Sequence, residues 1–394
     1  MGLEHPEGAR PSGRIRMRPE DFYVEEVGAI APSGQGEHIA AWVVKRGVDH
    51  QSMVRRIAQQ LGVPPSKVSW AGTKDRVAVT QQWITIHAPD AVLPSLDDED
   101  LSLHQVTRHD RRIRLGQVIG NRFRICIREI DPLEAPRMHR HLLALQADGL
   151  ANKFMEQRFG HRGANPTMGV RMLQKDWNGV LSAWLGLDGP TWPGEEDERR
   201  HLFADERFDQ AAQKWPGNWA AECHALKMLA SGHSVQEVVK AIPRPMRRYW
   251  TDSVQSAVFN DVVDQRAQAG TLRTLLDGDI SWTHDRFLAA IGENEQDCPP
   301  SATGPLWGRK MRPAAGAIDA MELEAGRSRG LTEDIMCGNA AATGSRRPLV
   351  VPVAQVSAGA GFDDHGPLIE VSFILPKGCY ATAVIDELID RGGS

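Results

Sequence analysis

The chain has 394 residues, of which 41% are hydrophobic and 25% are charged, and its formal net charge is −5. This length and balance leave room for two domains with buried cores and exclude a mainly disordered chain. The five cysteines lie far apart without a Cys-x-x-Cys pair, which argues against a zinc module and a disulfide framework. No apolar run approaches the roughly 18 residues of a membrane span, and residues 1–20 lack the apolar core of a signal peptide. We therefore expect a cytoplasmic protein that does not enter a membrane.

The first predicted elements are two strand regions and a helix. Residues 14–27 and 39–45 have the alternation and the β-branched or aromatic content of strands. Residues 49–61 predict a helix, because five apolar side chains recur there at a spacing of three to four residues. Gly62 and Pro64 end that helix.

A polar loop follows, between two further strands at residues 68–70 and 80–87. It carries Asp75 between Lys74 and Arg76. The loop is open to two interpretations. It is either a simple connection, in which Asp75 bonds neighbouring amides, or the site of a catalytic carboxylate.

The net charge conceals a basic segment between Arg108 and Arg128, which contains seven arginines and one acidic residue, Asp110. Toward its end apolar residues alternate with Arg122, Arg124 and Arg128, which predicts a strand with a row of guanidinium groups on one face. Such a row is either a solvated face or a track for RNA phosphates. A helix is predicted next, from Pro136 to near Gly149.

Beyond residue 166 the pattern becomes mainly helical. Helical periodicity covers residues 219–230, 234–241 and 246–268, and Gly-, Ala- and Ser-rich connections are predicted at 301–308 and 340–347. Strand patterns return at 349–351 and 369–375, and a closing helix is predicted at 382–389. A helical block between two β-rich blocks predicts an α+β fold, in which an insertion interrupts one domain.

Several segments, taken together and in this order, resemble the TruD family of tRNA pseudouridine synthases. The most specific of them is Ala71-Gly72-Thr73-Lys74-Asp75-Arg76. The others include Arg18-Pro19-Glu20-Asp21-Phe22, Gly36-Glu37-His38, Gly120-Asn121-Arg122-Phe123, Gln157-Arg158-Phe159-Gly160, Gly304-Pro305-Leu306-Trp307-Gly308 and Leu375-Pro376-x-Gly378-x-Tyr380.

The resemblance implies a catalytic domain with a mixed β-sheet of the pseudouridine-synthase type, interrupted by a mainly helical α/β insertion called the TRUD domain. We expect the catalytic domain at residues 1–163 and 348–394 and the insertion at residues 164–347. The implied activity is that of an isomerase, which converts uridine 13 of transfer RNA to pseudouridine. Transfer RNA is then the expected partner, and we expect a monomer.

The resemblance also implies roles for individual residues. Asp75 is the expected catalytic aspartate, and the expected substrate-binding residues are Arg16, Phe22, Lys74, Asn121, Phe123 and Tyr380. The arginines expected to bind RNA phosphates are Arg108, Arg111, Arg112, Arg122, Arg124 and Arg158. We expect Arg16 to lie beside Asp75 and favour its ionised form, and Tyr380 to stack on the extruded uracil. Phe22, Phe123 and Asn121 also have plainer interpretations. Phenylalanines on alternating strands are often core residues, and asparagines often form turns.

The implied reaction needs no cofactor, because it exchanges one ribose–base bond for another with no net oxidation. The sequence also lacks a P-loop, a dinucleotide fingerprint and a set of metal ligands at ordinary spacing. Its Gly-rich string at residues 358–361 predicts a loop. Alternatives are a family member acting on another tRNA position or on mRNA, a non-catalytic RNA-binding protein, and a hydrolase or nuclease that uses Asp75 with a metal.

Overall fold

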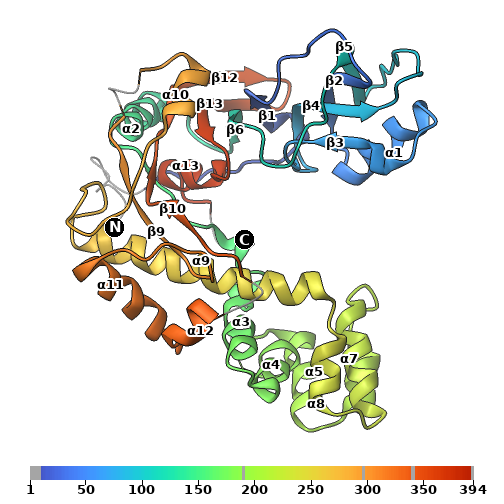
Figure 1. Ribbon diagram of the computed structural model, residues 1–394, viewed down its shortest axis with the longest axis vertical. Coiled ribbons are helices and arrows are strands. Elements are labelled where there is room, and N and C mark those ends of the chain that lie inside the picture. Colours follow the sequence, from blue (N-terminus) through green and yellow to red (C-terminus); the bar gives the residue numbers. More distant parts are fainter. Residues whose placement is uncertain (1–9, 189–190, 295–297, 339–341, 392–394) are drawn as a thin grey trace. The chain divides into compact units, whose positions relative to one another are not determined.

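The computed structural model in Figure 1 describes residues 10–188, 191–294, 298–338 and 342–391. The chain forms two compact units. The first comprises Met1–Ala151, Thr283–Pro300 and Val350–Ser394, and the second comprises Asn152–Trp282 and Ser301–Leu349. The functional boundaries expected after residues 163 and 347 stay a prediction. Residues 1–9 and 392–394, at the ends of the expected catalytic domain, lie outside the described residues.

A mixed β-sheet forms the centre of the first unit. Its strands are β1 (Phe22–Val27), β2 (His38–Arg46), β3 (Val68–Trp70), β4 (Val79–His87), β5 (Leu101–His109), β6 (Gly120–Arg128), β12 (Ala354–Asp363) and β13 (Gly366–Pro376). The strand order is β12-β13-β6-β1-β4-β2-β5, and β3 pairs with β4. Strands β1 and β4 run parallel, and the other neighbours run antiparallel. A separate short pair joins β7 (Leu150–Ala151) to β11 (Val350–Val351).

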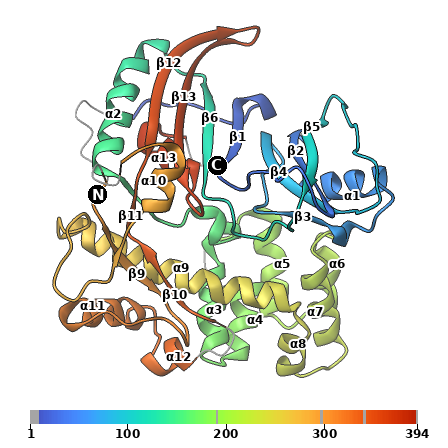
Figure 2. The same cartoon turned by 45° about the horizontal axis from the view of Figure 1, so that its top comes forward.

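Three hydrophobic clusters hold the helices of the first unit against its strands. These helices are α1 (His50–Gln60), α2 (Ala135–Asp148), α10 (Asp285–Ile291) and α13 (Ala381–Leu388). Met53 and Ile57 of α1 pack with Ile84 of β4, as the predicted helical spacing requires. Leu142 of α2 and Ile385 of α13 belong to a second core under β6 and β13. Figure 2 shows α2 alongside the β12–β13 hairpin.

The second unit is mainly helical. Its helices are α3 (Asn165–Leu173), α4 (Trp177–Leu185), α5 (Gly194–Ala204), α6 (Phe208–Lys214), α7 (Ala220–Ala230), α8 (Val235–Ala241), α9 (Arg244–Gln268), α11 (Gly316–Arg327) and α12 (Glu333–Gly338). The predicted capping box is present, because Ser234 and Glu237 cap α8 reciprocally. The long helix α9 packs against α3, α11 and a small sheet (Figure 1). That sheet has the order β10-β9-β8, formed by Ser345–Pro348, Ser301–Leu306 and Ser281–Trp282.

The α+β prediction is confirmed, but six strands were not predicted, namely β5, β7, β8, β9, β10 and β12. Strands β9 and β10 occupy segments predicted as connections, residues 358–361 lie inside β12 and not in a loop, and β5 lies in a stretch without a predicted element. These segments have few β-branched or aromatic residues, so their own composition does not favour strands. Pairing with β8, β13 and β2 supplies the hydrogen bonds that composition does not reveal. In the described part of the chain no helix is long and apolar enough to cross a membrane.

Candidate active site

Asp75 lies in the loop between β3 and β4, as predicted. Hydrogen bonds from β4 and from the residue after β2 hold this loop against the sheet. Gln82 of β4 is fully buried, and its amide donates to the carbonyl of Gly72 at 3.1 Å. Gly47, just after β2, donates its backbone N–H to the carbonyl of Ala78 at 3.2 Å. The loop is therefore attached to the sheet at both of its ends.

Lys45 supports the middle of the same loop. Its ammonium donates to the carbonyl of Asp75 at 2.6 Å and to the carbonyl of Val48 at 2.9 Å, and the residue is fully buried. Burial lowers the pKa of Lys45 to about 8, although the carboxylates of Asp75 and Asp49 act in the opposite direction. A buried cation beneath the main chain of Asp75 thus fixes the position of the loop.

Arg16 lies against the carboxylate of Asp75. One Nη of Arg16 donates to Oδ2 of Asp75 at 2.7 Å, and the Asp75 side chain is 56% exposed. The guanidinium of Arg16 also covers the ring of Phe22, 4.0 Å from its centroid. The backbone of Arg16 has a φ of 58°, in the left-handed region that costs a residue with a Cβ about 1–2 kcal/mol. Strain of this kind is often found at functional sites.

Lys74 is paired inside the unit. Its ammonium lies 2.6 Å from Oε1 of Glu26 on β1, and the two side chains are 7% and 0% exposed. Burial raises the pKa of Glu26, although Lys74 favours the charged form. The substrate contact expected of Lys74 stays a prediction, while the structure shows its ammonium in a buried ion pair with Glu26.

We expect Glu26→Gln to lower the free energy of unfolding by about 3–5 kcal/mol, because the Lys74 ammonium would stay buried without its partner charge. The double variant Glu26→Gln/Lys74→Met should lose less, since both charges are gone. Denaturant unfolding measures these differences. Glu25→Gln, at the neighbouring and less buried position of β1, is the control and should change stability by less than about 0.5 kcal/mol. If Glu26→Gln and Glu25→Gln lowered the free energy of unfolding equally, the buried ion pair of Glu26 with Lys74 would not be what stabilises the protein here.

The expected base-binding residues occupy different environments. Phe22 and Phe123 are 2% and 7% exposed and contact each other edge to face within the core. Asn121 is half-buried, and its Oδ1 is buried without a hydrogen-bond partner among the described residues. Tyr380 is half-buried at the N-terminus of α13. Phe22 therefore links the core to Arg16, whereas Asn121 has an unused acceptor.

The six arginines expected to bind phosphates differ in exposure and in their hydrogen-bond partners. Arg111, Arg112 and Arg124 are exposed, and the other three are half-buried. Arg108 donates to the carbonyls of Ala88 and Ala91, and Arg122 donates to Gln355. Arg158 lies in the second unit, where it donates to Ser256 at 3.0 Å. Arg111, Arg112 and Arg124 thus have the geometry best suited to phosphate contacts.

Arg128 departs from the predicted row of guanidinium groups. It is only 5% exposed, donates to Asp21 through Nε at 2.8 Å, and forms an ion pair with Asp363 at 2.7 Å. Arg128 holds the pKa of Asp363 below its usual range. The prediction of an exposed Arg128 is wrong, because this guanidinium joins the start of β1 to the β12–β13 hairpin.

Lys45, Glu26 and Gln82 were not found by sequence reasoning. For Lys45 a signal existed, since it continues the alternation of buried positions Ile39, Ala41 and Val43 on β2. Its partners were not readable, because a main-chain carbonyl leaves no trace in a residue pattern. Among the described residues, no three His, Cys, Asp or Glu side chains converge as ligands for a metal ion.

Comparisons with known proteins place the chain in a family. Residues 7–388 match the family model for tRNA pseudouridine synthase D (TruD). A relative named tRNA pseudouridine synthase D from Geobacter sulfurreducens is 31% identical, over 97% of this chain and 95% of its own length. One of the same name from Pseudomonas putida is 30% identical, over 97% and 94% of the two chains. A crystal structure of TruD from Methanosarcina mazei shares the fold, with a TM-score of 0.78, 24% identity, and coverage of 99% of this chain and 96% of the other. The chain belongs to the TruD family of tRNA pseudouridine synthases, which are RNA uridine isomerases.

Proposed function

We propose that this protein isomerises uridine 13 of transfer RNA to pseudouridine, with Asp75 as the catalytic carboxylate and without a bound cofactor. The observation that carries the proposal is the contact of 2.7 Å between Arg16 and Asp75 on a loop that buried side chains fix from below. Family membership supports the reaction class. The position in the RNA and the role of Asp75 belong to the proposal.

The reaction breaks the bond from ribose C1′ to uracil N1, turns the uracil, and forms a bond from C1′ to C5. The proton that leaves C5 balances the proton gained at N1, so reactant and product have the same composition. An ionised carboxylate promotes this change either as a nucleophile or as a base that removes a sugar proton. Both roles require a fixed carboxylate beside the sugar, which the anchored loop supports.

The residues around Asp75 have distinct proposed roles. Arg16 orients the carboxylate through its contact with Oδ2. Asn121 accepts from the uracil N3–H, since a buried acceptor without a partner costs about 1–3 kcal/mol that such a donor would recover. Tyr380 stacks on the extruded base, while Phe22 and Phe123 support the site from the core. Lys74 is assigned to support of the loop through Glu26.

The proposal is tested by mapping pseudouridine in an unmodified tRNA transcript after incubation with the purified protein in the presence of a chelator. We expect modification of uridine 13 and no product from a transcript with cytidine at position 13. Product at another position would reject the assignment of uridine 13. Binding of tRNA without any product would favour the non-catalytic alternative.

Arg16→Met is expected to lower the single-turnover rate by about 10- to 100-fold, because the carboxylate loses the charged group that orients it. The affinity for tRNA should change by less than threefold. Arg16→Lys should keep most of the activity, because the charge remains. Arg14→Met removes a more exposed arginine that pairs with Glu129, and it serves as the control. If Arg16→Met and Arg14→Met have the same single-turnover rate, Arg16 does not orient the carboxylate of Asp75.

A further inference from the structure

A second site lies beside the loop that carries Asp75. A cavity of ≈ 1320 Å³ lies entirely within the first unit, and Asp75 is not among the residues that line it. It is formed by β3, the start of β2, residues 30–33 and the loop from residue 109 to residue 117. Ligand sites commonly measure about 300–1,000 Å³. The cavity is therefore large enough for a nucleotide.

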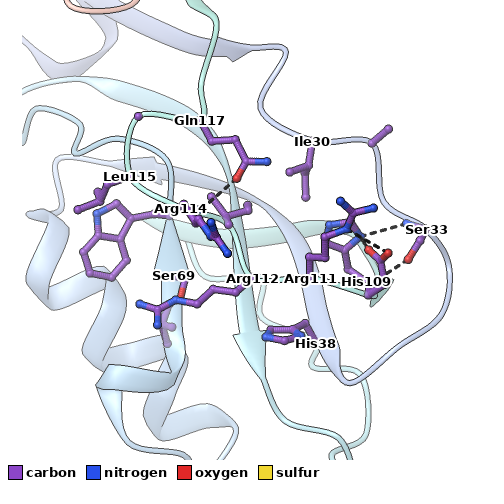
Figure 3. Close-up of a pocket in the computed structure, with 16 residues that line it drawn as sticks. Ile30, Ser33, His38, Ser69, His109, Arg111, Arg112, Arg114, Leu115 and Gln117 are labelled. Carbon is purple, nitrogen blue, oxygen red and sulfur yellow. Dashed lines mark hydrogen bonds and ion pairs between the residues drawn. The ribbon is translucent and has the colours of Figure 1, made fainter.

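The charge of the cavity suits a phosphate. Its walls include Arg111, Arg112 and Arg114 but only one acidic residue, Asp110, which accepts from Arg111 at 3.3 Å. The guanidinium groups of Arg112 and Arg114 have no hydrogen bond or ion pair to any other described residue. Figure 3 shows Arg112 extending toward Ser69, while Arg111 and Ser33 lie at the other end of the cavity. A guanidinium group can donate two hydrogen bonds to the oxygens of one phosphate. The guanidinium groups of Arg112 and Arg114 are free of protein acceptors among the described residues and can bind phosphate in this way.

The cavity also has surfaces for a base. Trp70 of β3 lines it, and the indole is held edge to face by His50 at 4.5 Å. His38 lines the cavity as well, and its Nδ1 is buried without a hydrogen-bond partner in the described part of the chain. Burial lowers the pKa of His38, so the neutral ring can bond a base edge. An aromatic side chain beside cations is the usual combination for unpaired nucleic acid.

Backbone contacts join the cavity to the proposed active site. The N–H of Gly116 donates to the carbonyl of Ala71, at the start of the Asp75 loop, at 2.8 Å. The carbonyl of Gly116 accepts from Lys377, three residues before Tyr380, at 2.6 Å. The loop that carries Arg112 and Arg114 is thus bonded directly to the start of the Asp75 loop and to the segment before Tyr380.

We propose that this cavity is a second nucleotide subsite, which binds an unpaired nucleotide of the RNA substrate together with its phosphates while the target uridine is at Asp75. This inference rests on the proposed function for the identity of the RNA. The subsite recruits the substrate and takes no part in bond breaking.

The test compares tRNA binding by two double variants in an Asp75→Asn background. Arg112→Ala/Arg114→Ala removes the cavity cations, and Arg55→Ala/Arg286→Ala removes two exposed arginines of the same unit outside the cavity. We expect the cavity variant to bind tRNA at least tenfold more weakly, and the slope of log affinity against log salt to fall by about 1.4, as for two single-strand phosphates. The control should stay within twofold of the parent.

A crosslinking readout completes the test. A photoactivatable 4-thiouridine in the tRNA should crosslink to residues 68–70 or 109–117 in the parent and not in the cavity variant. Equal affinities and salt slopes for the two double variants would overturn the subsite, and so would micromolar binding of free UMP or AMP that the cavity variant loses. Turnover by Asp75→Asn would instead reject the proposed function and leave the binding comparison valid.

Discussion

Asp75→Asn is expected to abolish pseudouridine formation, with a single-turnover rate at least about 10³-fold below that of the unmodified protein. Asparagine has nearly the same size and can still accept from Arg16, but it is neither a nucleophile of comparable strength nor a base. Because only the chemistry changes, the affinity for tRNA should stay within about threefold. Quantification of pseudouridine after a single turnover, with tRNA binding measured in parallel, checks both statements.

The matched control is Asp90→Asn, which alters an exposed aspartate in the turn after β4. It should have normal turnover. If Asp75→Asn keeps more than about a tenth of the rate, the carboxylate is not essential. If both variants lose activity equally, a general effect of charge is responsible.

Lys45→Met is expected to lower kcat by about 100-fold with little change in KM, because the carbonyl of Asp75 loses its buried donor and the loop becomes less fixed. Lys45 does not touch the substrate in this account, so it is a positioning residue. Lys67→Met, which removes an exposed lysine of the same unit, is the control and should have normal kinetics.

The pH profile separates this positioning role from simple destabilisation. Burial lowers the pKa of Lys45 to about 8; Asp75 and Asp49 oppose that shift, and Lys74 adds to it. The ammonium therefore predominates below about pH 8 and is lost as the pH rises through that value. The unmodified protein should lose kcat with an apparent pKa near 8, whereas Lys45→Met should show a low rate without that step. A step near pH 8 in both proteins would assign the titration to another group.

The polar loop and the candidate Asp75 could be predicted, because the loop lies between two strands with clear patterns. It also led to the expectation of a cation at Arg16 beside Asp75, through the family resemblance. For Lys74 the sequence indicated a substrate contact, which stays a prediction, but it did not reveal the ion pair with Glu26, 48 residues away. Pairings over such separations depend on the strand order and leave no local pattern.

Strands β5, β9, β10 and β12 illustrate the same limit for the fold. Residues 358–361 are alternately Ala and Gly, yet they pair with residues 368–371 of β13 in a regular antiparallel register. Small residues have little preference for strands, so their composition does not predict one. Here the pairing with β13 makes the segment a strand. In contrast, α1 and α8 were predictable, because helical spacing and a capping box are local features.

The most direct measurement is the distance between side chain 75 and C1′ of uridine 13 in a structure of Asp75→Asn bound to unmodified tRNA. We expect the uracil out of its stack, with C1′ about 3.5 Å from the residue 75 side chain and with Arg16 beside it. A uridine 13 that remains stacked in the RNA, or that lies elsewhere on the protein while residue 75 faces solvent, would contradict the account.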